Sequence, residues 1–325
     1  MAYSTGTATD FEDLWNQFVT EITTNLGAAD NWTQVWTNGT DEFVFQGPGI
    51  AGGGAPFVGI RKVADAAADI YEWQMYGMTG YNAAAADMSQ HVQVSPMVRL
   101  LLTNSSMTWW LSGNARRFVL TVRISTYYEA CYGGFFLPFL TPAEYPYPCF
   151  IGAAAMEGTD ADIPVRWNDA TAGHRLFTDP GRSDGKTAWV LDPQRIWRSV
   201  DDVSDYGAND RDTDYHLHPN VVGKVWQGDD PAIGGERWQE TSDEPDSNWV
   251  IQKLRGCLGG GNPVWPLTIF KSDGNAVLGR LEGVYRAPVY NATAETVVTI
   301  GGVGHICFPN VWRQDATDLW ALKQE

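Results

Sequence analysis

Positively charged residues are scarce in this sequence. Its 325 residues include 22 Lys and Arg against 39 Asp and Glu, which gives a formal net charge of −17. Nucleic-acid-binding proteins contact phosphates mainly through clustered Lys and Arg, and here only Arg116-Arg117 and residues 195–198 offer small basic groups. The sequence therefore predicts no nucleic-acid partner. Its negative charge also keeps closely packed copies soluble through mutual repulsion.

Cysteine is scarce too, and long apolar runs are missing. The four cysteines, Cys131, Cys149, Cys257 and Cys307, form no C-x-x-C pair and have apolar neighbours, so we expect buried free thiols. The first residues contain neither the basic nor the apolar stretch of a secretory signal. No apolar run has the length of a membrane span. The expectation is a soluble protein that is made in a reducing cytosol.

Recognisable catalytic motifs are also absent. There is no G-x-S-x-G nucleophile elbow, and the glycine-rich loop at residues 47–56 lacks the G-K-[ST] ending of a phosphate-binding loop. A glycosidase would need two carboxylates that flank a cleft, but nothing in the sequence selects one pair. With five histidines and no activated nucleophile in view, we predict that the chain is not an enzyme and uses no cofactor.

Acidic residues gather in the middle of the chain, where residues 157–255 hold 20 of the 39. Within their densest run, Asp210, Asp212 and Asp214 have the spacing that opens a calcium-binding loop. Such a loop then needs a glycine and a bidentate glutamate, but Tyr215 and Val221 stand at those positions. We therefore predict a solvated acidic loop and no metal site, with incidental binding of a divalent ion as the alternative.

Gly, Pro and Trp are abundant, whereas only 19% of the residues are charged. This composition favours many short strands joined by turns. The best helix is predicted at residues 9–26, where Thr9 or Asp10 can cap the first turn and Gly27 ends the run. Its apolar residues, which include Trp15 and Phe18, recur at helical spacing. The predicted fold class is therefore α+β and β-rich, with an N-terminal amphipathic helix.

Alternating apolar and β-branched residues predict strands along both flanks of the chain. The N-terminal flank offers residues 32–36, 42–46, 57–62, 98–102, 108–111 and 118–128, while residues 65–77 fit either a strand or a helix. The C-terminal flank offers residues 265–270, 278–290, 296–313, with a hairpin turn at Gly301-Gly302, and 319–322. We expect residues 1–156 and 256–325 to build one antiparallel sheet or sandwich, with residues 157–255 as an acidic, loop-rich insertion of short strands and loops.

Between Gly133 and Phe150 the sequence alternates prolines with aromatic residues. Each proline removes a ladder N–H group and fixes φ, so we predict that the chain leaves its sheet here as an extended arm. Its apolar surface is costly in water, at roughly 25 cal/mol per Å², and must lie over its own core or on a neighbouring subunit. We predict the second, with assembly contacts at Phe135, Phe136, Phe139, Tyr145, Tyr147, Phe150, Trp15 and Phe18.

Fifteen tryptophans raise the alternative of a glycan-binding surface, because exposed indole faces stack on sugars. Most of them fall on apolar faces of predicted elements, where packing explains them. The exceptions lie in the acidic insertion and are Trp189, Trp197, Trp226 and Trp238. These four residues would form such a surface.

Several blocks of the two flanks resemble a group of virion structural proteins of tailed bacteriophages, associated with the tail or baseplate. The blocks are MAYSTGTATDFEDLW leading to NWT at residues 31–33, FQGPG at 45–49, FVGIR at 57–61, the arginine-led NARRFVLTVRISTYYEACYGGFFLPFLTPAEYPYPCFIGA, LGRLEGVY at 278–285, TVVTIGGVGHICFPNVWR and the closing ALKQE. They cover roughly two thirds of the chain, and none is a catalytic motif.

The resemblance implies a building block of the particle, made in the bacterial cytoplasm and located in the virion. It implies no site residues. Its expected partners are other copies of itself and other tail or baseplate proteins. The expected function is homo-oligomeric assembly in a contractile or flexible tail, near the baseplate. The alternatives are a glycan- or receptor-binding tail module, a virion-associated cell-wall hydrolase, and a head or neck structural protein.

Overall fold

The computed structural model describes residues 2–157, 166–168, 181–182, 185–201, 215–218, 264–271, 277–287, 292–309 and 319–324. Strands dominate these residues, and one α-helix lies near the N-terminus. The predicted β-rich α+β fold class is confirmed. No helix within these ranges is both long and apolar enough to cross a membrane.

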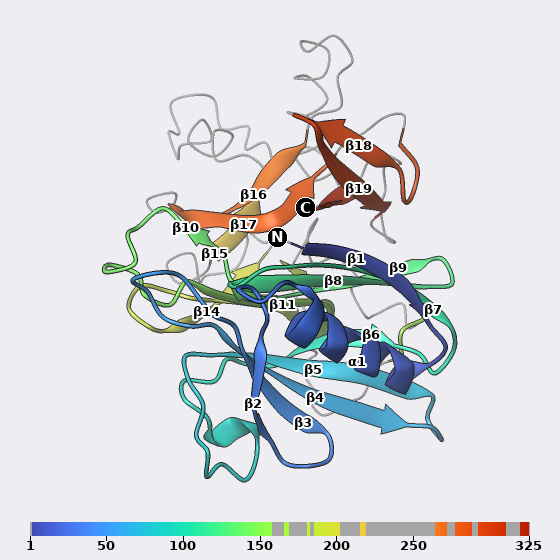
Figure 1. Ribbon diagram of the computed structural model, residues 1–325, viewed down its shortest axis with the longest axis horizontal. Helices are drawn as coiled ribbons and strands as arrows, with labels where there is room; N and C mark the ends of the chain where they lie inside the picture. Colours follow the sequence, from blue (N-terminus) through green and yellow to red (C-terminus); the bar gives the residue numbers. More distant parts are fainter. Residues whose placement is uncertain are drawn as a thin grey trace.

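The strands form three layers, which follow one another from the bottom to the top of Figure 1. The N-terminal sheet contains β2 (Thr33–Thr37), β3 (Glu42–Gln46), β4 (Phe57–Asp65), β5 (Ile70–Met78) and β6 (Val98–Leu102). The central sheet contains β1 (Ala2–Ala8), β7 (Met107–Gly113), β8 (Arg117–Ile124), β9 (Tyr127–Phe135), β11 (Cys149–Glu157), β12 (Gly181–Arg182), β13 (Gly185–Leu191) and β14 (Trp197–Asp201). The C-terminal sheet contains β10 (Leu137–Pro138), β15 (Tyr215–His218), β16 (Trp265–Lys271), β17 (Val277–Arg286), β18 (Val297–Ile300), β19 (Val303–Pro309) and β20 (Leu319–Lys323).

Two strand pairings join the layers. β11 pairs with β9 and β13 in the central sheet, and its Ala155 also meets Arg99 of β6 in the N-terminal sheet. β14 ends the central sheet and pairs in parallel with β15, the first strand of the C-terminal sheet. The described parts of the acidic insertion thus contribute strands to both sheets.

The helix α1 (Phe11–Thr20) begins where the sequence predicts. Asp10 is its N-cap, and the Oδ1 atom of Asp10 accepts a hydrogen bond from the Asp13 backbone N–H at 2.9 Å. A π-helical turn, η1 (Glu21–Asn25), extends the predicted span to its expected end. The apolar face of α1 lies between the N-terminal and central sheets (Figure 1), where Trp15 meets Trp73 with ring centroids 5.3 Å apart. The helix therefore closes the first of two main cores.

The central sheet is buried on both faces. On β8, Phe118, Leu120 and Val122 belong to the core beside α1, whereas Val119 belongs to the core beneath the C-terminal sheet. Successive side chains of a strand point to opposite faces, which explains why β8 carries apolar residues at both odd and even positions. The second core is completed from the C-terminal sheet by residues such as Leu281 and Phe308.

The predicted single strand at residues 118–128 is wrong. The alternating run is a hairpin, in which β8 ends at Ile124 and β9 begins at Tyr127. Ser125 takes a φ of 57° at the turn, a left-handed conformation that non-glycine residues adopt rarely. β9 also continues to Phe135, so the expected break at Gly133-Gly134 does not occur.

The segment between β5 and β6 forms a third, smaller core on the outer face of the N-terminal sheet. It contains the 3₁₀ turn η2 (Met88–Gln90) and packs Met88 against Trp36, Val44 and Met78. His91 is buried in this segment, with its ring centroid 4.6 Å from that of Trp36. Its Nδ1 atom accepts a hydrogen bond from the Asn82 backbone N–H at 3.1 Å.

We expect His91 to make the protein less stable as the pH falls. Burial lowers the pKa of His91, and Asp87 opposes this effect. The unfolded chain therefore binds the proton first, and stability is lost below about pH 6.5 by at most about 1.4 kcal/mol per pH unit. Urea unfolding at pH 7.5 and 5.5 should show a smaller loss for His91→Gln than for the wild type. Equal losses in the two proteins would contradict this role.

Candidate functional site

The aromatic arm, residues 135–150, crosses from one sheet to another within the same chain. β9 ends at Phe135, and β10 then joins the C-terminal sheet by pairing with Gly279 and Arg280 of β17. After a turn at residues 139–146, the chain returns to the central sheet as β11. The arm therefore joins two layers of the same subunit, and its exposed part is the turn between β10 and β11.

Most of the predicted contact residues in this arm are buried in their own subunit. Phe136 is 0% exposed and packs on Tyr145, with ring centroids 5.7 Å apart. Phe135 is also fully buried, and Phe150 packs on Tyr132 at 5.3 Å. The prediction that these residues contact a neighbouring copy is wrong, because the arm already lies between two sheets that cover it.

Polar contacts fix the arm in this position. The Tyr132 hydroxyl donates to the Phe135 carbonyl at 2.9 Å, and the Tyr145 hydroxyl donates to the Leu191 carbonyl. The Phe136 backbone N–H donates to the Pro148 carbonyl at 3.0 Å. These bonds hold the two ends of the arm side by side.

The tip of the arm, which we define as Phe139 and Leu140, is exposed. The two side chains are 54% and 38% exposed. The Phe139 backbone N–H donates to the Leu278 carbonyl at 2.9 Å, and the Arg280 guanidinium lies 5.3 Å from the Phe139 ring centroid. Tyr147 is half-buried beside Arg195, whose guanidinium lies 5.4 Å from its ring centroid. Among the predicted contact residues of the arm, Phe139 is the one whose side chain is exposed while its backbone is bonded to β17.

The two predicted contact residues of the helix are buried as well. Trp15 is 5% exposed and Phe18 is 2% exposed. Phe18 packs on Trp73 and Phe118, with ring centroids 5.0 and 5.2 Å away. The prediction that Trp15 and Phe18 form an assembly surface is wrong, because the helix docks on the two sheets of its own chain.

A buried arginine joins the central sheet to the C-terminal sheet. Arg117 is 0% exposed, and its Nη1 atom donates to the Ser112 carbonyl at 2.6 Å and to Ser112 Oγ at 3.1 Å. Its Nε atom lies 4.0 Å from Glu282 Oε2, while the other carboxylate oxygen, Oε1, accepts a hydrogen bond from Arg116 Nη2. Burial lowers the pKa of Arg117, while Tyr132 and Glu282 oppose that shift.

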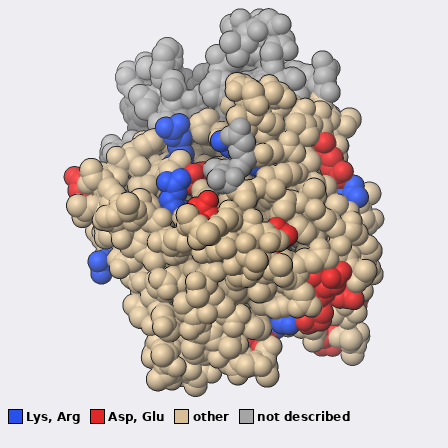
Figure 2. Space-filling model, in the orientation of Figure 1, with Lys and Arg blue, Asp and Glu red and all other residues tan. Residues whose placement is uncertain are grey.

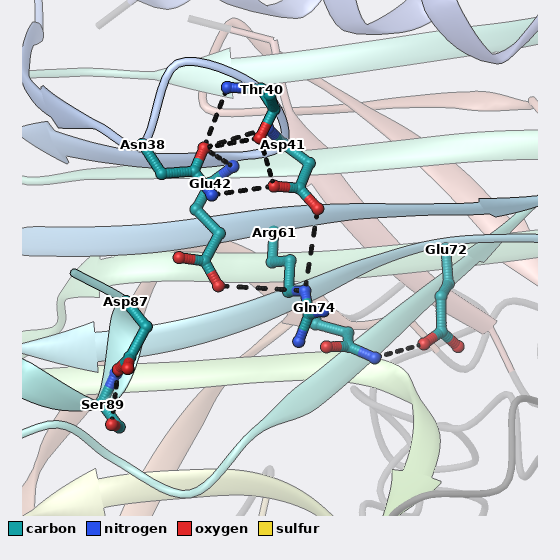
Figure 3. Close-up of polar contacts among 9 residues, drawn as sticks. All are labelled: Asn38, Thr40, Asp41, Glu42, Arg61, Glu72, Gln74, Asp87 and Ser89. Atoms are coloured by element: carbon teal, nitrogen blue, oxygen red, sulfur yellow. Dashed lines mark hydrogen bonds and ion pairs between the residues drawn. The ribbon is translucent and has the colours of Figure 1, made fainter.

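A row of polar and charged side chains crosses the outer face of the N-terminal sheet, and Figure 3 shows its part from Glu42 to Glu72. Glu42, Arg61, Gln74 and Arg99 occupy consecutive cross-strand positions from β3 to β6. Arg61 Nε lies 3.8 Å from Glu42 Oε1, and Gln74 Nε2 donates to Glu72 Oε1 at 2.7 Å. The ion pair between Arg99 Nη1 and Glu72 Oε2 is 3.5 Å long.

Two carboxyl groups in this row have perturbed acidity. Burial raises the pKa of Glu72 and of Glu42, and the nearby Arg99 and Arg61 oppose the shifts. A raised carboxyl pKa is a property of general acids. Here, however, Arg61 and Gln74 stand between the two carboxyl groups (Figure 3), and each glutamate is paired with a different arginine. These side chains therefore have a structural role, in which ion pairs and hydrogen bonds connect adjacent strands of the sheet.

Sequence reasoning does not single out Arg117 or this row. Alternation alone places Glu72 and Gln74 on one face of a strand, but residues 65–77 also fit a helix, so that signal is ambiguous. Arg117 is visible only as part of a small basic pair with Arg116. Its partner Glu282 is distant in sequence, and no local pattern connects the two.

The remaining predicted site residues are only partly described. Trp197 is half-buried, and its indole N–H donates to the Gln93 carbonyl at 2.8 Å, while Trp189 packs against the core beside α1. Trp226, Trp238 and the carboxylates Asp210, Asp212 and Asp214 lie outside the described residues. Within the described ranges, no group of three or more His, Cys, Asp or Glu residues could hold a metal ion.

The cysteines fit the expectation of buried thiols where the structure describes them. Cys131, Cys149 and Cys307 are free and buried. Burial raises the pKa of Cys131 and of Cys307 to about 12 and also raises the pKa of Cys149. Because the thiolate is the reactive form, burial and the raised pKa both disfavour reaction of these three thiols at neutral pH. Cys257 lies outside the described residues.

In comparisons with known proteins, no protein-family model matches the chain, and no curated protein sequence matches it.

Proposed function

We propose that this chain is a structural component of a tailed-phage virion, most simply a tail or baseplate protein that acts by homo-oligomeric assembly. The sequence blocks of the two flanks support this proposal, because they resemble virion structural proteins of that class. In this proposal the chain contributes a rigid three-layer body. Its functional surfaces are those that neighbouring subunits cover in the assembled particle. Head or neck placement is a variant of the same structural role.

The observation that carries the proposal is the exposed tip of the arm. Phe139 and Leu140 place two large apolar side chains in solvent, and a backbone hydrogen bond from Phe139 to Leu278 of β17 fixes the chain at this point. A rigid apolar anchor of this kind loses little conformational entropy when a neighbour covers it. Most of the face shown in Figure 2 is uncharged, and most of the acidic side chains visible there lie along its right margin; depletion of charge is typical of interface cores.

The proposal can be tested on virions of a phage that encodes this sequence. Gradient-purified particles should contain the chain in several copies, measured by quantitative peptide mass spectrometry, and gold-labelled antibody should locate it on the tail. Phe139→Asp should reduce incorporation, whereas the matched exposed aromatic change Tyr81→Asp should not. If the chain stays in the lysate and is missing from purified virions, the proposal fails.

One observation favours a second function, that of a glycan-binding module. Trp197 is half-buried and follows the exposed Ile196 in the chain, so part of its indole ring is open to a ligand. Its indole N–H is already engaged by Gln93, which leaves only the ring surface for stacking. Binding on a glycan array that is lost in Trp197→Ala but kept in Phe139→Ala would support this function over the structural one.

A further inference from the structure

Three strands of four or more residues, β1, β2 and β18, have one side unpaired among the residues that the structure describes. An open edge is a template for another strand, and most proteins protect it with bulges, charges or coverings. β2 has a register shift between Gln34 and Trp36 that interrupts its ladder. On β1, the Thr7 carbonyl accepts a hydrogen bond from Gln17 Nε2 of the helix at 3.1 Å.

Among the described contacts, β18 itself has neither a register shift nor a side-chain hydrogen bond on its outer edge; a bulge, in which Glu295 and Thr296 both bond to Cys307, lies before its first residue. It pairs with β19 in an uninterrupted register from Val297↔Ile306 to Ile300↔Val303. Val297 and Ile300 are 48% and 38% exposed. Residues 296–304 contain no ionisable side chain. Glu295, just before the strand, is engaged by Arg123 and by the Tyr128 hydroxyl of the central sheet, so its charge is directed inward.

The hydrogen-bonding pattern shows which backbone groups of β18 face outward. The Cys307 backbone N–H donates to the Thr296 carbonyl at 2.9 Å, so Thr296 directs its carbonyl towards β19. In an antiparallel ladder this direction alternates along the strand. Val298 and Ile300 therefore bond to β19, whereas Val297 and Thr299 direct their N–H and C=O groups to the open edge.

We propose that β18 pairs antiparallel with β18 of a second copy of this chain, about a two-fold axis at Val298. In this register Val297 lies opposite Thr299 of the partner subunit. Every outward N–H and C=O group of Val297 and Thr299 then has a partner, and the C-terminal sheets of two copies become continuous. The proposal specifies one contact of the assembly proposed above and rests on it.

Symmetry and charge both favour a second copy of this chain as the partner that pairs with the open edge of β18. The two outward-facing residues are placed symmetrically about Val298, so the strand is complementary to itself in an isologous contact. Two copies with a net charge of −17 each repel one another, and a stable contact between them needs a surface without charge. Residues 296–304, which have no ionisable side chain, provide such an uncharged surface at an open sheet edge.

The test compares two exposed valines in the full-length chain. Val297 and Val92 are both 48% exposed, but only Val297 lies on the β18 edge. Sedimentation velocity over a concentration series should show a monomer–dimer equilibrium for the wild type and for Val92→Lys. Val297→Lys should weaken dimerisation at least roughly tenfold, because two lysines would face the joined edge. Each lysine also reduces the net negative charge, so added repulsion between whole molecules cannot explain the loss.

Hydrogen exchange provides a second readout that does not depend on the variants. In the dimer, the amide protons of Val297 and Thr299 should exchange more slowly than in the dilute monomer, while those of Val298 and Ile300 should change little. Unchanged thermal unfolding would show that Val297→Lys still folds. Wild-type chain that stays monomeric at every concentration, or Val297→Lys that dimerises as the wild type does, overturns the proposal.

The outcomes separate this inference from the proposed function. If the chain is present in virions in several copies but Val297→Lys dimerises normally, the pairing of β18 is wrong and the structural role stands. If Val297→Lys abolishes dimerisation but the chain is missing from virions, the pairing is right and the virion role is wrong.

Discussion

Replacing Phe136 by alanine is expected to lower the free energy of unfolding by about 3–5 kcal/mol, whereas Phe139→Ala should change it by less than about 0.5 kcal/mol. The two residues belong to the same arm and have the same side chain. Phe136 is 0% exposed between the central and C-terminal sheets, and Phe139 is 54% exposed at the tip. Alanine at position 136 leaves a cavity, but alanine at position 139 leaves only solvent.

Urea unfolding of the purified chain measures both changes. A protein concentration low enough to keep the chain monomeric removes any contribution of assembly. If the two substitutions cost the same, the arm does not fold over its own chain. A large loss for Phe136→Ala with a small one for Phe139→Ala would show that the prolines and aromatics of residues 135–150 mainly join two layers of one subunit.

Gly283→Ala is expected to destabilise the protein by about 3 kcal/mol or more. Gly283 has a φ of 82°, and a Cβ atom there would overlap the Arg117 guanidinium. The arginine would have to move away from Ser112 and Glu282, and disruption of a buried ion pair typically costs about 3–5 kcal/mol. The strained backbone adds about 1 kcal/mol.

Gly39→Ala is the matched control for this change. Gly39 has a similar φ of 91°, but a Cβ atom there would have no neighbour within 4 Å. Only the backbone strain remains, so we expect a loss of about 1 kcal/mol. The difference between the two variants in thermal or urea unfolding measures the contribution of the Arg117 contact. Equal losses would mean that Arg117 can be displaced at no cost.

The helix and the turns that depend on neighbouring residues could be predicted from the sequence. The points where these elements begin and end show the reason. Asp10 caps α1 because a carboxylate at that position accepts a backbone N–H, and this depends only on neighbouring residues. The Gly301-Gly302 pair also predicts a hairpin turn locally, because glycine adopts positive φ readily. Both residues have positive φ values in the structure. The turn at Ser125 was missed because serine gives little sign that it will adopt a left-handed conformation.

The candidate site was harder to predict, because burial depends on distant segments. The sequence shows that the apolar arm must be covered, but not which segment covers it. That segment is β17, which pairs with Leu137 and Pro138 from far along the chain. The same holds for the open edge of β18: the alternating residues predict a strand, and only the order of strands in the sheet shows that one side is unpaired.

A reconstruction of the intact particle by cryo-electron microscopy tests the central claim most directly, because it shows the copies of this chain together with their neighbours. We predict several symmetry-related copies in the tail, with Phe139 and Leu140 covered by an adjacent subunit and β18 paired with β18 of a second copy. A particle without this chain, or one in which both surfaces of every copy face solvent, would contradict the account.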